Sequence, residues 1–149
     1  PRFQRHFENA VQRAEKFTSR INQNAKKIQI LVDELRRAGA ENNRERVTRL
    51  REQLQKDIQQ FKDTVGRFRR AMNRVRAMGQ LSHRVEGFFE KNRDKYSNQD
   101  IAMIRPSLMA IADKRAQLKD IFKATVSNIK KTFRELKALK QESRSPRGQ

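Results

Sequence analysis

The chain has 149 residues, the length of one ordinary domain, and a formal net charge of +19 from 36 Lys and Arg against 17 Asp and Glu. Hydrophobic residues make up only 35% of it, which predicts narrow helical seams and excludes a thick sandwich core. The sequence has no cysteine, which excludes disulfides and thiolate metal sites, and no apolar run of the about 18 residues that a transmembrane helix needs. Because so large a charge repels itself in a compact chain, it predicts an anionic partner: nucleic acid, a membrane surface or an acidic glycoprotein coat.

The first half of the chain predicts two long helices. Apolar residues recur at steps of three and four, which marks one stripe along each helix. The first helix should end at Ala38-Gly39, since glycine readily takes the left-handed cap conformation, and the polar turn GAENN should lead into a second helix that stops at Gly79. The two stripes are Phe7, Val11, Ala14, Phe17, Ile21, Ala25, Ile28, Val32 and Leu35, and then Val47, Leu50, Leu54, Ile58, Phe61, Val65, Phe68, Met72, Val75 and Met78.

Residues 81–106 predict shorter pieces. The stripe continues over residues 81–89 as a short third helix, and Ser97 with Asp100 resembles a capping box that starts another helical turn. Pro106 disfavours helix at the residue before it but suits a first helical position, so it predicts the start of a final long helix. The stripe of that helix is Leu108, Ile111, Leu118, Phe122, Val126, Ile129, Phe133 and Leu136.

These elements predict an all-α, up-and-down bundle of four or five helices, two or three of them long and amphipathic. Residues 1–141 should form a single domain in which Ile28, Leu54, Phe61 and Ile129 are buried. Residues 142–149, ESRSPRGQ, have no periodicity and are expected to be a disordered basic tail.

Basic residues gather in two places. No Asp or Glu occurs from Thr64 to Val85, and a second basic face follows the last predicted helix. A merely solvated exterior is the alternative, but it would mix both signs of charge. We expect these side chains to bind an anionic surface: Arg67, Arg69, Arg70, Arg74, Arg76 and Arg84 in the first group, and Lys119, Lys123, Lys130, Lys131, Arg134 and Lys137 in the second.

No catalytic motif is present. The two histidines, His6 and His83, do not form a His-Glu-x-x-His pattern, and the sequence has neither a glycine-rich phosphate loop nor a Gly-x-Ser-x-Gly elbow. We therefore expect a protein that is not an enzyme and that holds no cofactor and no metal.

The adjacent pair Phe88 and Phe89 is a candidate apolar contact. Neighbouring helical residues point about 100° apart, so both rings cannot face one narrow seam. One ring should lie partly exposed beside basic side chains, which suits a membrane interface or a docking partner. A wide seam that buries both rings is the alternative.

The run FFEKNRDK at residues 88–95, followed by Met103, Ile104 and Pro106, resembles gastropod acrosomal sperm proteins, the abalone egg-envelope lysins and their fusagenic paralogue. The order of a long helix, a longer one and shorter pieces is also similar. This resemblance implies a secreted, cationic five-helix bundle of the acrosomal vesicle that acts on the egg envelope or in sperm–egg membrane fusion. Its partner would be an anionic membrane or an acidic egg-coat glycoprotein. A start at Pro1 suits a processed chain, and equally a trimmed one. Lysins are rich in Trp and Tyr, whereas this chain has no Trp and one Tyr.

Residues 21–61 also resemble the first helix, turn and second helix of the N-terminal three-helix domain of syntaxins. That resemblance implies a cytoplasmic regulatory domain in vesicle trafficking, although such domains are usually far more acidic. Nucleic-acid binding by a helical bundle is the other alternative, because the arginine-rich stretch could neutralise phosphates. The sequence carries no signal for an oligomeric state.

Overall fold

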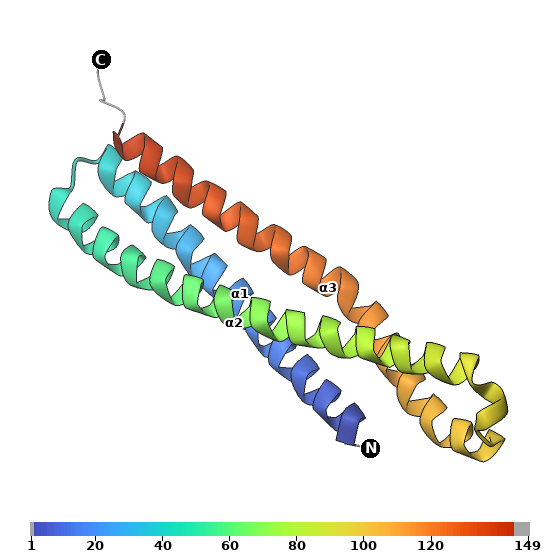
Figure 1. Ribbon diagram of the computed structural model, residues 1–149. Helices are drawn as coiled ribbons and strands as arrows, with labels where there is room; N and C mark the ends of the chain where they lie inside the picture. Colours follow the sequence, from blue (N-terminus) through green and yellow to red (C-terminus); the bar gives the residue numbers. More distant parts are fainter. Residues whose placement is uncertain (1, 145–149) are drawn as a thin grey trace. The chain divides into compact units, whose positions relative to one another are not determined.

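The computed structural model describes residues 2–144, which form three long α-helices and one short 3₁₀ turn (Figure 1). Helix α1 spans Arg2–Ala40, α2 spans Arg44–Lys91, η1 spans Arg93–Lys95 and α3 spans Asn98–Arg144. The predicted all-α class is therefore confirmed, but the predicted count of four or five helices is wrong. Of the expected tail, residues 142–144 continue α3, and residues 145–149 lie outside the part that the structure describes.

The turn between α1 and α2 lies where GAENN predicts it, but an asparagine makes the cap. Asn42 has a φ of 56° and is the left-handed residue after α1, whereas Gly39 is still helical. The amide of Asn43 donates to the carbonyl of Ala38 at 3.0 Å, and that of Asn42 to the carbonyl of Gly39 at 3.2 Å, which is the Schellman arrangement. Asn43 then starts α2, since its Oδ1 accepts from the amide of Arg46 at 3.2 Å.

Helix α2 does not stop at Gly79, and no separate third helix begins at Leu81. Gly79 is buried inside α2, and a Cβ at this position would lie 2.7 Å from Cδ of Arg115 on α3. The glycine therefore serves a close approach of α3 and does not end the helix. Glycine weakens a helix by about 1 kcal/mol relative to alanine, yet α2 continues past it to Lys91.

Pro106 lies inside α3, about two turns after its start, and does not begin a helix. The start at Asn98 agrees with the predicted cap, because Oγ of Ser97 accepts from the amide of Asp100 at 3.1 Å. A proline at this position removes the N–H that would bond to the carbonyl of Ala102. Both residues are exposed, so water can reach this part of the helix, and α3 continues despite the cost of about 3 kcal/mol.

The chain forms two compact units, each built from segments of all three helices. The first unit comprises residues 2–16 and 67–123 of the described chain, and the second comprises 17–66 and 124–144. In the first unit the rings of Phe68 and Phe122 meet edge to face with centroids 5.8 Å apart. Its buried side chains also include Phe7, Val11, Val75, Ile111 and Leu118.

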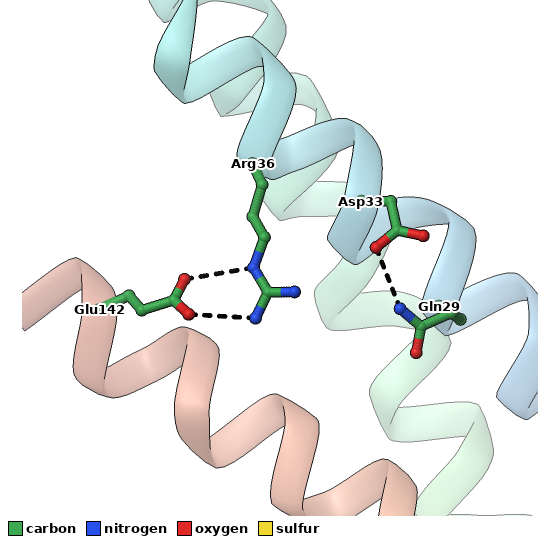
Figure 2. A network of polar contacts seen from close by, with 4 residues as sticks. All are labelled: Gln29, Asp33, Arg36 and Glu142. Carbon is green, nitrogen blue, oxygen red and sulfur yellow. Dashed lines mark hydrogen bonds and ion pairs between the residues drawn. The ribbon is translucent and has the colours of Figure 1, made fainter.

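The second unit buries the four residues expected from the stripes: Ile28, Leu54, Phe61 and Ile129. The ring of Phe61 packs edge to face on Phe133, with centroids 5.4 Å apart. At the solvent side of this unit, α1 and α3 are joined by a bidentate pair in which Nε and Nη2 of Arg36 lie 3.2 and 3.1 Å from the carboxylate oxygens of Glu142 (Figure 2). Both side chains are 41 to 48% exposed and reach solvent, so this pair contributes at most about 1 kcal/mol.

Candidate anionic-surface site

The arginine group on α2 lies wholly in the first unit, and all six side chains are exposed. Arg67, Arg70 and Arg74 are spaced by three and four and share one side of the helix, whereas Arg69 and Arg76, seven apart, share another. The buried side chains of Phe68, Met72 and Val75 occupy the remaining side of the helix. The arginines therefore cover the solvent surface of this stretch of α2.

These six guanidinium groups form no ion pair with any residue that the structure describes. Ion pairs do form elsewhere: Arg36 with Glu142, Arg46 with Glu41, and Lys114 with Glu15. Residues 64–85 of α2 contain no carboxylate that could pair along the helix. Asp63, one turn before Arg67, instead accepts a hydrogen bond from Nε2 of Gln59 at 3.1 Å. This surface thus carries a concentrated, uncompensated positive charge.

The second predicted basic group is exposed as well, but the structure divides it between the two units. Lys119 and Lys123 belong to the first unit, together with the arginines of α2. The other four belong to the second unit, where Lys130, Arg134 and Lys137 share one side of α3 by their spacing of four and three. Together with Lys131, these three residues form a cationic surface that belongs to the second unit.

The aromatic pair lies at the end of α2, where the chain turns into η1 and α3 (Figure 1, yellow to orange). Phe88 is 52% exposed and Phe89 is half-buried, so one ring does reach the surface. Tyr96 joins them, with centroids 4.9 Å from Phe89 and 6.0 Å from Phe88. Asn92 holds the backbone at this point, because its amide and its Nδ2 both donate to the carbonyl of Phe88 at 3.1 and 2.9 Å.

The structure adds exposed apolar side chains to this unit that sequence reasoning did not assign to a contact surface. Met103 is 75% exposed on the first turns of α3, and Leu81 and Met109 are also exposed. The two methionines lie outside the stripe of Leu108 and Ile111, which is the signal that could have identified them. Leu81 was expected in the stripe of residues 81–89 and is exposed instead. Basic side chains stand near this turn in sequence, namely Arg84, Lys91, Arg93, Lys95 and Arg105, all exposed.

Residues 2–144 contain no cluster of three or more His, Cys, Asp or Glu side chains that could hold a metal ion. No helix in that range has the length and apolarity needed to cross a bilayer. Both His6 and His83 are exposed.

Residues 2–144 define an all-α protein in which three long helices carry a cationic surface without ion pairs among these residues, and an exposed aromatic turn. Comparison with protein-family models, with curated proteins and with solved structures gave no match. The function is therefore proposed from the chain's own surface.

Proposed function

We propose that this protein is a non-enzymatic binder of an anionic surface, held by the arginines of α2 and by the exposed aromatic turn. The observation that carries the proposal is the set of six exposed arginines without an ion pair in the described chain. Natural surfaces usually intersperse both signs of charge, and a surface of one sign attracts counter-charged partners over a Debye length of about 10 Å at 0.1 M salt.

The aromatic turn supplies a contact that salt does not screen. Full burial of a phenylalanine side chain contributes about 1.5 to 3 kcal/mol, and Phe88 is about half exposed before binding. Its insertion into a membrane interface or a partner would therefore add about 1 kcal/mol. Coulomb attraction would bring the protein to the surface, and the ring would lengthen its residence there.

The anionic surface that fits best is a membrane or an acidic egg-coat glycoprotein, as the resemblance to acrosomal sperm proteins implies. In this proposal the protein is secreted, is stored in the acrosomal vesicle, and acts in fertilization through envelope dissolution or membrane fusion. The support consists of the charge, the FFEKNRDK run and the exposed Phe88. The five helices that the resemblance implies are not observed, since residues 2–144 form three.

The test measures binding across a salt series. Co-sedimentation measures binding to phosphatidylserine vesicles and to neutral phosphatidylcholine vesicles, and binding to duplex DNA is measured separately. The triple variant Arg67→Gln/Arg70→Gln/Arg74→Gln should bind anionic vesicles more weakly and with a shallower salt dependence. Its matched control is Arg44→Gln/Arg49→Gln/Arg51→Gln, which removes the same charge from the carboxylate-containing start of α2 in the second unit. Equal weakening by both variants, or affinity that does not change with salt, would refute the proposal. Leakage and lipid-mixing assays on the same vesicles separate binding from fusion.

Nucleic-acid binding is the second candidate, favoured by the same unpaired arginines. Neutralised phosphates release counterions, so the logarithm of affinity for duplex DNA would fall by about 0.9 per phosphate contact for each logarithm of salt. Tighter binding to DNA than to anionic vesicles at the same salt would select this candidate.

A syntaxin-type regulatory domain in the cytoplasm is the third candidate, favoured by the three long helices and the short turn at residues 41–43. Such a domain would act on a helical trafficking partner. It predicts that neither vesicles nor DNA are bound in a salt-dependent way.

A further inference from the structure

A groove in the first unit lies between residues 75–86 of α2 and residues 112–122 of α3. It has a volume of about 460 Å³, enough for a small polar ligand or a lipid headgroup. Four basic side chains line it, Arg76 and His83 from α2 and Arg115 and Lys119 from α3, together with the single carboxylate of Glu86. Three permanent cations thus face one carboxylate.

None of these cations is neutralised by the rest of the described chain. Arg76, Arg115 and Lys119 have no ion pair with any residue the structure describes, and Glu86 likewise takes part in none. The permanent charges of the groove therefore leave two positive charges uncompensated. A phosphate monoester carries about −1.5 to −2 at neutral pH and three acceptor oxygens, which matches this excess in sign and size.

The backbone of α2 positions one of these cations. The stem of Arg115 lies so close to Gly79 that a Cβ there would meet its Cδ at 2.7 Å and its Nε at 3.1 Å. An alanine at this position would force the stem of Arg115 to move away from its present path.

Ser82 adds a neutral donor to the same lining. Its side chain is only 4% exposed, and it has no hydrogen-bond partner among the residues that the structure describes. Its hydroxyl oxygen is not completely enclosed, since the described residues contain no completely buried side-chain nitrogen or oxygen without a partner. A buried hydroxyl of this kind is expected to find a partner, and a phosphate oxygen would supply one.

From these observations we infer that the groove between α2 and α3 is a binding site for a phosphate monoester group. Arg76, Arg115 and Lys119 supply charge-assisted hydrogen bonds to its oxygens, and Ser82 donates one more. The inference rests on the proposed anionic binding, because Arg76 and Lys119 belong to both, but it adds a defined pocket and a stoichiometry of one. The monoester comes either from a lipid such as phosphatidic acid or from a soluble phosphorylated compound.

Calorimetry with glycerol 3-phosphate tests the site on the full chain. We expect saturable binding of one molecule per chain, weakened about tenfold or more in Arg115→Gln/Lys119→Gln, because this variant removes two charge-assisted hydrogen bonds. The matched control is Arg13→Gln/Lys16→Gln, which removes the same two residue types from exposed, unpaired positions of the first unit outside the groove. It should change the affinity by less than about twofold, since exposed charges at a distance are screened.

Gly79→Ala separates geometry from charge. It keeps every cation and favours the helix, so it should fold normally, yet it displaces the stem of Arg115 and should weaken binding by a factor between those of the control and the double variant. Unchanged affinity in Gly79→Ala would overturn the inference. Equal losses of affinity in the two double variants would overturn it as well, and so would the absence of saturable binding. The source of the phosphate is identified by comparing vesicles that contain phosphatidic acid with phosphatidylserine vesicles of matched surface charge. Tighter binding to phosphatidic acid means that the ligand is a lipid. Equal binding to both vesicles, together with binding of free glycerol 3-phosphate, means that the ligand is a soluble compound.

The two proposals fail in different ways. If anionic vesicles are bound with a steep salt dependence but glycerol 3-phosphate is not bound, the groove is not a site and the surface function stands. If glycerol 3-phosphate is bound while vesicles are not, the site stands and the surface function fails.

Discussion

Replacement of Phe61 by alanine tests the packing of the second unit. The side chain is 0% exposed and its ring packs edge to face on Phe133 at 5.4 Å. Truncation of a buried phenylalanine costs about 3 to 5 kcal/mol, of which the ring pair accounts for about 0.5 to 1.5. Phe133 is only half-buried and lines an open groove with Leu54 and Ile58, so neighbours can shift into part of the space. We therefore expect the lower end, about 3 kcal/mol.

Urea unfolding followed by far-ultraviolet circular dichroism measures this loss. With a slope of about 2 kcal/mol per molar urea, the midpoint should fall by about 1.5 M. The control is Phe88→Ala, the same change on the same helix at a ring that is 52% exposed, which should cost less than about 1 kcal/mol. Equal losses in the two variants, or a loss below about 1 kcal/mol for Phe61→Ala, would show that the assigned core is wrong.

Three further changes test local features of the first unit. Ser97→Ala removes the acceptor for the amide of Asp100 and should lower the free energy of unfolding by about 1 kcal/mol in the same urea assay; no loss would mean that the cap does not form. Pro106→Ala restores an N–H inside α3 and should raise that free energy by about 2 kcal/mol, after the greater freedom of the unfolded chain is subtracted; a decrease would contradict the helical path through this residue. Phe88→Ser should fold normally but lose the part of vesicle binding that persists at high salt, whereas Phe89→Ser should mainly reduce stability; equal destabilisation by both would mean that the two rings serve only the fold.

The stripes of apolar residues predicted the core because burial follows helical periodicity directly. Phe61 and Ile28 are buried where the 3-4 spacing places them. The helix ends were less predictable, since Gly79 and Pro106 are local signals that weaken a helix without ending it. At Gly79 the decisive fact is the approach of Arg115, a residue 36 positions later in the sequence, which no local pattern contains.

The cationic surface of α2 was predictable from the missing Asp and Glu, which also leave its arginines without ion pairs. A stretch without Asp or Glu offers no partner along the helix, so charge composition alone indicates exposure. The groove was not predictable, because Arg115 and Lys119 of α3 come together with Arg76, Gly79 and Ser82 of α2 only when the two helices pack.

The two compact units are interlaced along the chain, and this has a consequence for how the protein can be dissected. Each unit takes its helices from both sides of the turn at residues 41–43: the first from 2–16 and 67–123, the second from 17–66 and 124–144. A single cut in that turn would leave two fragments that both contribute to both cores, so the fragments should stay associated and behave as a complementing pair. To isolate either unit would require breaks inside all three helices, after residues 16, 66 and 123. A gene rearrangement could therefore not transfer either unit alone to another protein as one continuous segment. The whole described chain is the smallest portion that could be transferred with its surface intact.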